Sequence, residues 1–150
     1  MAGRYFEDFR VGEVIALGSR TLSAVEIIAF ARDFDPQPFH TDPERAKASV
    51  FGGLVASGWH TAALYMRLLV DGMIAHVAHS MGSPGVDKIE WLQPVRPGDT
   101  LTGRLTIVDA IPSRSRPDRG TFKTLGEMVN QKGEVVMTIR GVGFFGRRPQ

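Results

Sequence analysis

An aspartate and a histidine lie five residues apart on a segment that contains two prolines, Asp35-Pro-Gln-Pro-Phe-His40. Each proline fixes its own φ angle and disfavours the α region for the residue before it. The spacing therefore predicts an extended or turning strip that holds both side chains in place. A carboxylate and an imidazole that reach one water can move protons in either direction near neutral pH. We interpret Asp35 and His40 as a general acid/base pair, and a turn-stabilising aspartate beside a surface histidine is the alternative.

Length and composition limit the kind of protein that carries this pair. The chain has 150 residues, of which 43% are apolar, so we expect residues 1–150 to fold as one domain around a single core. The formal net charge of +2 gives no reason to expect nucleic acid as a partner. Cysteine is absent, which excludes disulfides, thiolate metal ligands and a cysteine nucleophile.

Two segments bear on where the protein resides. Residues Met1–Phe9 lack the apolar stretch of a signal peptide. The longest apolar run, Trp59–Ala78, is interrupted by Arg67 and Asp71, which argues against a membrane span. We therefore expect a cytoplasmic protein that does not contact a membrane.

Local signals predict a strand and three helices in the first half of the chain. Residues Val14–Leu22 are compatible with a strand, and Ser23-Ala-Val-Glu26 matches a capping box that opens a helix to about Arg32. Thr41-Asp-Pro-Glu44 offers a second helix start, with an end near Ser49. The longest helix is predicted over about Ser57–Ala78.

The long helix is apolar around most of its circumference. A helix of that kind is expected to be buried by another element that wraps it. One stripe is polar and contains His60, Arg67 and Asp71. We expect this stripe to face solvent or a second subunit, with Arg67 and Asp71 as an i,i+4 ion pair.

The second half of the chain predicts four strands. Val86–Val95 is the first, and the next alternates apolar and polar residues through Leu101–Ile107. Phe122–Val129 and Val135–Phe145 form a predicted hairpin, with Gly133 suited to a left-handed turn position. One strand, then helices, then four strands is the order of an α+β protein whose antiparallel sheet curls around the central helix.

Three stretches resemble the MaoC-like acyl dehydratase family, relatives of the R-specific enoyl-CoA hydratases, and the resemblance covers almost the full chain. They are Phe34–Asp42, Gly52–Gly58 and Pro94–Asp99, of which the first is the most specific. The resemblance implies a hotdog fold, in which a curved antiparallel sheet wraps a long helix. It also implies an acyl-CoA thioester as substrate, reversible addition of water across a 2,3-double bond, and a homodimer or a dimer of dimers. Coenzyme A then enters only as part of the substrate, and no other cofactor or metal ion is expected.

The family motif Asp-x-Asn-Pro-x-His has a catalytic aspartate and histidine, which fall on Asp35 and His40. We assign water activation to Asp35 and proton shuttling to His40, with the reverse left open. The asparagine of the motif is replaced here by Gln37, whose amide stands one methylene further from the backbone. The hydrogen bonding around the pair is therefore expected to differ from that of the family.

The start of the long helix supplies the remaining candidate residues. The backbone N–H of Gly58 is one of the donors left unpaired within the helix, and with the helix dipole it can stabilise an enolate oxygen. Tight helix–sheet packing is the alternative reason for this glycine. Ser57 either caps the helix or lines the site, and we expect Gln37, Ser57, Phe51 and Trp59 to contact substrate.

Two other functions remain open. A hotdog acyl-CoA thioesterase would use the carboxylate to activate water against the carbonyl carbon. A non-catalytic subunit that binds acyl thioesters would keep the fold without turnover. A loop rich in Arg and Pro is predicted over Ile111–Gly120, and within it Arg114–Arg119 either binds the phosphates of coenzyme A or is simply solvated.

Overall fold

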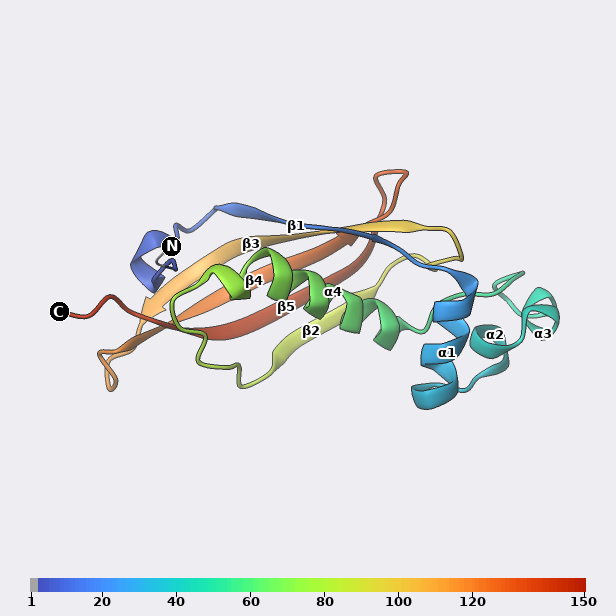
Figure 1. Ribbon diagram of the computed structural model, residues 1–150, viewed down its shortest axis with the longest axis horizontal. Helices are drawn as coiled ribbons and strands as arrows, with labels where there is room; N and C mark the ends of the chain where they lie inside the picture. The colour runs from blue at the N-terminus through green and yellow to red at the C-terminus, as the bar shows by residue number, and fades with distance from the viewer. Residues whose placement is uncertain (1–2) are drawn as a thin grey trace.

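A computed structural model describes residues 3–150 of the chain. The elements, in chain order, are η1 (Phe6–Asp8), β1 (Val14–Thr21), α1 (Ala24–Phe34), α2 (Pro38–Thr41), α3 (Pro43–Lys47), α4 (Gly58–Gly72), η2 (Ile74–His76), β2 (Val86–Trp91), β3 (Thr100–Pro112), β4 (Arg119–Val129) and β5 (Val135–Gly146). The strands form one antiparallel sheet in the order β1-β3-β4-β5-β2. Figure 1 shows α4 along one face of the curved sheet and α1, α2 and α3 gathered beyond one end of it. The α+β prediction is confirmed.

Helix α1 begins and ends as its sequence predicts. The Ser23 hydroxyl accepts the Glu26 N–H at 3.1 Å, and the Glu26 carboxylate accepts the Ser23 N–H at 3.3 Å, which completes the capping box. At the other end, the N–H of Asp35 donates to the Ala31 carbonyl at 2.8 Å. Asp35 is therefore the C-cap residue, and a rigid helix fixes its backbone position.

Helix α4 begins at Gly58 with Ser57 as its N-cap, but it ends at Gly72, before the predicted Ala78. Gly72, the last residue of the helix, packs directly against β1. A Cβ on Gly72 would lie 2.6 Å from the Cα of Leu17, so only glycine allows β1 to approach the helix this closely. Met73 then leaves the helical conformation, with φ −137° and ψ −59°.

The strands of the second half follow the predicted pattern, except for the end of β2. Leu101, Leu105 and Ile107 of β3 are buried on one face, and Gly133 has φ +77° in the hairpin turn. Strand β2 stops at Trp91, short of the predicted Val95. The N–H groups of residues 92 and 93 both donate to one carbonyl of β5, which breaks the regular ladder before Pro94.

Other elements were predicted to wrap α4 on all sides. In the structure they cover only the side of the helix that faces the sheet. Leu64, Tyr65 and Leu68 are buried there, in one core with residues of β3, β4 and β5. On the other side Trp59 is 58% exposed and Met66 is 48% exposed. Part of the apolar surface of α4 is therefore uncovered in a single chain.

The residues of the polar stripe of α4 lie in two different environments. Arg67 and Asp71 form the predicted ion pair, with Nε and Oδ2 2.8 Å apart. The expectation that His60 lies in the same solvated stripe is wrong, because its ring stacks on Phe30 of α1 at 4.5 Å between centroids and an interplanar angle of 6°. Burial lowers the pKa of His60, so this packing favours the neutral ring.

Gly126 of β4 gives a stability prediction. A Cβ at this position would overlap the Tyr65 hydroxyl and lie 2.6 Å from Cγ2 of Ile139. Gly126→Ala is therefore expected to lower the free energy of unfolding by about 1–3 kcal/mol through overpacking, measured by chemical denaturation. Gly53→Ala is the matched control, since its Cβ would meet only Nη1 of Arg96 at 3.5 Å. Equal stability of the two variants would contradict the packing seen here.

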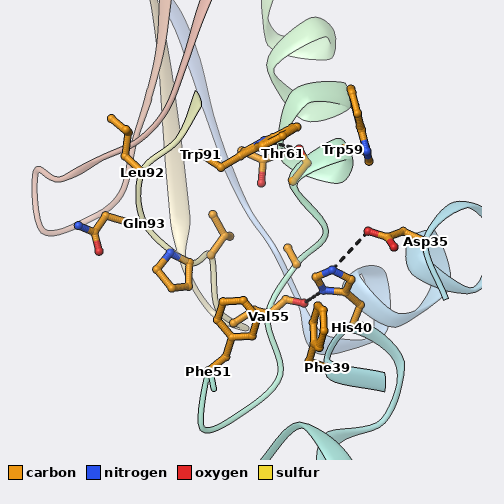
Figure 2. Close-up of a pocket in the computed structure, with 14 residues that line it drawn as sticks. Asp35, Phe39, His40, Phe51, Val55, Trp59, Thr61, Trp91, Leu92 and Gln93 are labelled. Atoms are coloured by element: carbon orange, nitrogen blue, oxygen red, sulfur yellow. Dashed lines mark hydrogen bonds and ion pairs between the residues drawn. The ribbon is translucent and has the colours of Figure 1, made fainter. Parts of the chain in front are cut away.

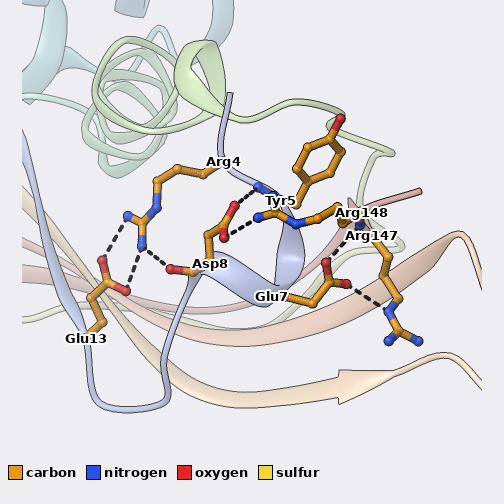
Figure 3. A network of polar contacts seen from close by, with 7 residues as sticks. All are labelled: Arg4, Tyr5, Glu7, Asp8, Glu13, Arg147 and Arg148. Carbon is orange, nitrogen blue, oxygen red and sulfur yellow. Dashed lines mark hydrogen bonds and ion pairs between the residues drawn. The ribbon is translucent and has the colours of Figure 1, made fainter. Parts of the chain in front are cut away.

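Charged side chains join the two ends of the described chain (Figure 3). Nε of Arg147 donates to Glu7 at 2.9 Å, and the backbone N–H of Arg148 donates to the other carboxylate oxygen at 2.8 Å. Desolvation alone would raise the pKa of Glu7, but these hydrogen bonds outweigh it and the pKa lies below its ordinary value. The contribution of Glu7 to stability is thus present above the ordinary carboxyl pKa and is lost as pH falls through the lowered one.

Candidate active site

The backbone of the Asp35–His40 segment differs from the predicted extended strip. Asp35 and Gln37 are not helical, but Pro38 begins the one-turn helix α2, which carries His40. Proline suits this first helical position because its fixed φ is helical and its missing N–H has no partner to lose. The N–H of His40 donates to the Gln37 carbonyl at 2.9 Å. Asp35 thus lies at the end of α1 and His40 in the next helix, α2.

The two side chains meet as the sequence predicts (Figure 2). Nε2 of His40 lies 3.3 Å from Oδ2 of Asp35. Nδ1 of His40 lies 2.6 Å from the carbonyl oxygen of Val55, which can only accept a hydrogen bond. This partner assigns the ring hydrogen to Nδ1, so the neutral ring turns the lone pair of Nε2 toward the carboxylate. His40 is 6% exposed, so its orientation is fixed by burial as well.

Two further side chains hold the Asp35 carboxylate. The Gln37 amide donates to Oδ1 at 2.7 Å, and the Ser57 hydroxyl donates to Oδ2 at 2.7 Å. Partial burial alone would raise the pKa of Asp35, but these two hydrogen bonds and the positive charge of His40 when its ring is protonated outweigh it. The pKa of Asp35 therefore lies below its ordinary value, and the carboxylate is ionised at neutral pH.

Ser57 connects the carboxylate to the start of α4. Its side chain is fully buried, and its oxygen also accepts the Trp59 N–H at 3.2 Å as the N-cap of the helix. One hydroxyl therefore sets the position of Asp35 relative to the first turn of α4. Ser57 and Gln37 were predicted to contact substrate, and in the structure both contact Asp35 instead of lining the adjacent cavity.

A cavity of about 480 Å³ opens beside the pair. Besides Asp35 and His40, the residues that line it within the described part of the chain are Phe39, Phe51, Val55, Ala56, Gly58, Trp59, Thr61, Trp91, Leu92, Gln93, Pro94 and Val95. Figure 2 shows aromatic side chains around this space, with Asp35 and His40 at one side. The fold thus brings the predicted Phe51, Gly58 and Trp59 to one cavity with Asp35 and His40.

Gly58 has the properties expected of an oxyanion donor. It is the first residue of α4, and within residues 3–150 no hydrogen bond uses its N–H. The tight packing considered as the alternative is present too, because a Cβ on Gly58 would lie 2.5 Å from Cε2 of Trp91. The packing reason for glycine therefore applies at this position, and the oxyanion role stays a prediction.

Val55 and Trp91 also belong to the site, and neither was predicted from the sequence. Val55 acts through its backbone carbonyl, which carries no sequence signal. Trp91 lies 33 residues after Gly58 in the chain, and only the fold brings the end of β2 to the start of α4. An aromatic residue just before the Pro94 motif was the one visible sign.

The predicted loop Ile111–Gly120 is shorter in the structure, because β3 runs to Pro112 and β4 begins at Arg119. Figure 1 shows that residues 113–118 join β3 and β4 at the end of the sheet opposite α1 and α2, so within one chain this loop does not reach the cavity. Arg119, at the start of β4, pairs with the adjacent Asp118 at 2.9 Å. Within residues 3–150, no group of three His, Cys, Asp or Glu side chains is placed to hold a metal ion. None of the helices described there has the length and apolar character required to cross a bilayer.

Comparison with known proteins assigns this chain to a family. Residues 9–127 match the model of the MaoC like domain. A MaoC-like dehydratase from Rhodospirillum rubrum has a crystal structure that superposes with a TM-score of 0.91, at 43% identity over 99% of this chain and 100% of that one. An (R)-specific enoyl-CoA hydratase from the same species is 29% identical over 93% of this chain and 94% of its own length. The uncharacterised protein YdeM of Bacillus subtilis is 29% identical over 84% of this chain and 87% of its own length.

The curved antiparallel sheet around α4 is thus a hotdog fold, as the resemblance predicted. The chain belongs to the MaoC-like domain family, whose members include hydratases and dehydratases.

Proposed function

We propose that this protein is a hydro-lyase that reversibly adds water across the 2,3-double bond of an acyl-CoA thioester. The proposal is carried by the Asp35–His40 pair, 3.3 Å apart, on the wall of a cavity that Gly58 also lines. The name of the Rhodospirillum rubrum relative, an (R)-specific enoyl-CoA hydratase, supports this reaction and the R configuration of the product.

The pair is suited to orient one water molecule. Oδ2 of Asp35 and Nε2 of His40 are both hydrogen-bond acceptors when the carboxylate is ionised and the ring carries its hydrogen on Nδ1. One water can donate a hydrogen to each of them. Its oxygen lone pairs then point away from the pair, toward C3 of a substrate held in the cavity.

The proton then follows a single path. Because the pKa of Asp35 is lowered, its carboxylate is the weaker base, and the first proton acceptor is Nε2 of His40. As the water oxygen bonds to C3, His40 takes the proton and Asp35 stabilises the imidazolium that forms. His40 then delivers this proton to C2, so one water supplies both the hydroxyl and the hydrogen. In this path His40 both activates the water and carries the proton, whereas water activation was assigned to Asp35 from the sequence.

Charge that develops on the thioester oxygen is met by the start of α4. The unused N–H of Gly58 donates to that oxygen, and the 15-residue helix adds the positive end of its dipole. The enolate is therefore stabilised on one side of the substrate while the water is held on the other.

We propose a second, apolar cavity, which shares no lining residue with the first, as the space for a longer acyl tail. A cavity of about 300 Å³ lies between α4 and the sheet, further along the helix, and Tyr65, Met66, Leu69, Ile139 and Val142 are among its walls. Coenzyme A is part of the substrate, and the proton path above needs no further cofactor.

A second copy of the chain is the proposed partner. Strand β2 is an edge strand, and Val86 and Trp91 on it are 50% and 44% exposed. Beside it, the exposed Trp59 and Met66 of α4 leave apolar surface that a monomer would present to water. Pairing of β2 with its counterpart would cover this surface and extend the sheet into a homodimer, which light scattering measures directly; a dimer of dimers would appear as twice that mass.

Gln37 gives a prediction on pH dependence. Without its amide, one hydrogen bond to the ionised Asp35 is lost, so Gln37→Ala should raise the pKa of that carboxyl. The pKa of the Asp35 carboxyl, read from the chemical shift of its carboxyl carbon in a pH titration, should therefore be higher in Gln37→Ala than in the wild type. Gln131→Ala removes an amide that bonds Thr100 and Asp99 and not the pair, so it should leave the Asp35 titration unchanged. An unchanged Asp35 titration in Gln37→Ala would show that the amide does not support the carboxylate.

One assay panel tests the reaction against its alternatives. Short- and medium-chain 2-enoyl-CoA substrates are followed for loss of enoyl absorbance and, in parallel, for release of free thiol. A hydratase removes the enoyl absorbance and releases no thiol. A thioesterase releases thiol, and a non-catalytic subunit shows neither signal although calorimetry detects binding.

A further inference from the structure

Trp91, the last residue of β2, packs directly against the glycine that begins α4. A Cβ on Gly58 would lie 2.5 Å from Cε2 and 2.7 Å from Nε1 of the indole, so the face of the ring covers the glycine Cα. The indole N–H also donates to the Gly58 carbonyl at 2.8 Å. Because Trp91 is 44% exposed and lines the cavity, burial in the core does not account for its position.

Hydrogen bonds fix the peptide groups on both sides of the Gly58 Cα. On one side, the Ser57 carbonyl accepts the N–H of Thr61 at 3.2 Å. On the other, the Trp59 N–H donates to the Ser57 hydroxyl at 3.2 Å, and Trp91 binds the Gly58 carbonyl. Glycine otherwise has the widest choice of φ and ψ. The direction of its N–H therefore depends on these bonds, and the indole supplies one of them.

The indole itself is anchored from two directions. The backbone of Trp91 pairs with Met137 of β5, and the next N–H, that of Leu92, donates to the Val136 carbonyl at 2.8 Å. The ring meets the Trp59 ring edge-to-face, with centroids 5.2 Å apart. The sheet therefore fixes the position of Trp91, and the contacts of Trp91 in turn fix the first turn of α4.

We propose that Trp91 is a positioning residue for the reaction. Its indole N–H holds the Gly58 peptide so that the Gly58 N–H faces the thioester oxygen, and its ring forms the wall against which the thioester lies. The inference rests on the proposed hydration of an enoyl thioester, and it adds a residue from a different element to that site.

Two substitutions distinguish the contribution of the indole hydrogen bond from that of the ring as a wall of the cavity. Trp91→Phe keeps an aromatic ring but removes the N–H donor, so kcat should fall about fivefold to tenfold while KM changes less than about twofold. Trp91→Ala removes the wall as well, so KM should also rise. Val108→Ala removes a comparably exposed apolar side chain from β3, away from the cavity, and should leave both constants unchanged. Circular dichroism of each variant confirms that it is folded.

A binding measurement gives an independent readout. Trp59 and Trp91 are the two tryptophans of the chain, so Trp59→Phe leaves Trp91 as the only indole reporter. A saturated acyl-CoA, which has no double bond to hydrate, should change the emission of this variant in step with binding measured by calorimetry. Binding without a change in emission would overturn the wall, and wild-type kcat in a folded Trp91→Phe would overturn the positioning role. If the wild type hydrates no enoyl-CoA, the proposed function fails first, and this inference with it.

Discussion

Asp35→Asn and His40→Ala are each expected to lower kcat for hydration of a 2-enoyl-CoA about 10²–10⁴-fold, the usual contribution of a positioned proton-transfer group. Asparagine at position 35 keeps the shape of the side chain but replaces one carboxylate oxygen with an amide nitrogen, so the water loses an acceptor. Alanine at position 40 removes Nε2, which is the proton acceptor in the proposed path. Steady-state kinetics on the enoyl absorbance measure both losses.

The pattern of the two losses is as informative as their size. Because both groups hold the same water, the double variant should be little slower than the slower single variant. Asp33→Asn and His76→Ala are the controls, since they change the same residue types outside the cavity and should keep kcat within about twofold. Losses that multiply in the double variant would show that Asp35 and His40 act separately.

Gly58→Ala has the second large expected effect, a loss of about 10²–10³-fold in kcat, as for removal of one oxyanion donor. The added Cβ would lie 2.5 Å from the Trp91 ring, so the indole or the first turn of α4 must move. Either movement turns the N–H away from the thioester oxygen. The loss should appear in kcat more than in KM, because the N–H matters most when the oxygen is charged.

Gly53→Ala is the matched control for this substitution. Gly53 belongs to the same segment before α4, but its Cβ would have an ordinary contact of 3.5 Å with Arg96. It should therefore keep wild-type kcat. If Gly58→Ala is folded by circular dichroism and turns over at the rate of Gly53→Ala, the N–H of Gly58 has no part in catalysis.

Much of the fold follows from local signals in the sequence. The capping box at Ser23 fixes the start of α1, and the alternation of Leu101, Leu105 and Ile107 fixes the buried face of β3. Signals of this kind act over a few residues, so they need no knowledge of the rest of the chain. Helix α2 was not predicted, because one turn from Pro38 to Thr41 is too short to show a helical period.

From spacing alone, the candidate site was predictable only where its residues are close in the chain, whereas Phe51, Gly58 and Trp59 were expected there from the family resemblance and the predicted helix start. The meeting of Asp35 and His40 follows from their spacing and the prolines between them. The Val55 carbonyl that orients His40 and the Trp91 indole that covers Gly58 are contacts between distant segments. Their geometry depends on how α4 and the edge of the sheet pack, which composition and periodicity do not specify.

The exposed apolar side of α4 illustrates the same limit. Periodicity correctly indicated that Trp59 and Met66 belong to an apolar surface, but not what covers it. The sheet of the same chain covers the opposite side of the helix, where Leu64 and Leu68 are buried. A second copy at β2 is the proposed cover for the rest.

The most direct measurement of the central claim is incubation of wild-type protein with a 2-enoyl-CoA in water labelled with heavy oxygen, followed by mass spectrometry of the products. The proposed chemistry places the label in a hydroxyl at C3 of an intact thioester, and Asp35→Asn should slow its appearance to the same extent as kcat. Label in a free carboxylate, together with free coenzyme A, would contradict hydration and indicate hydrolysis of the thioester instead.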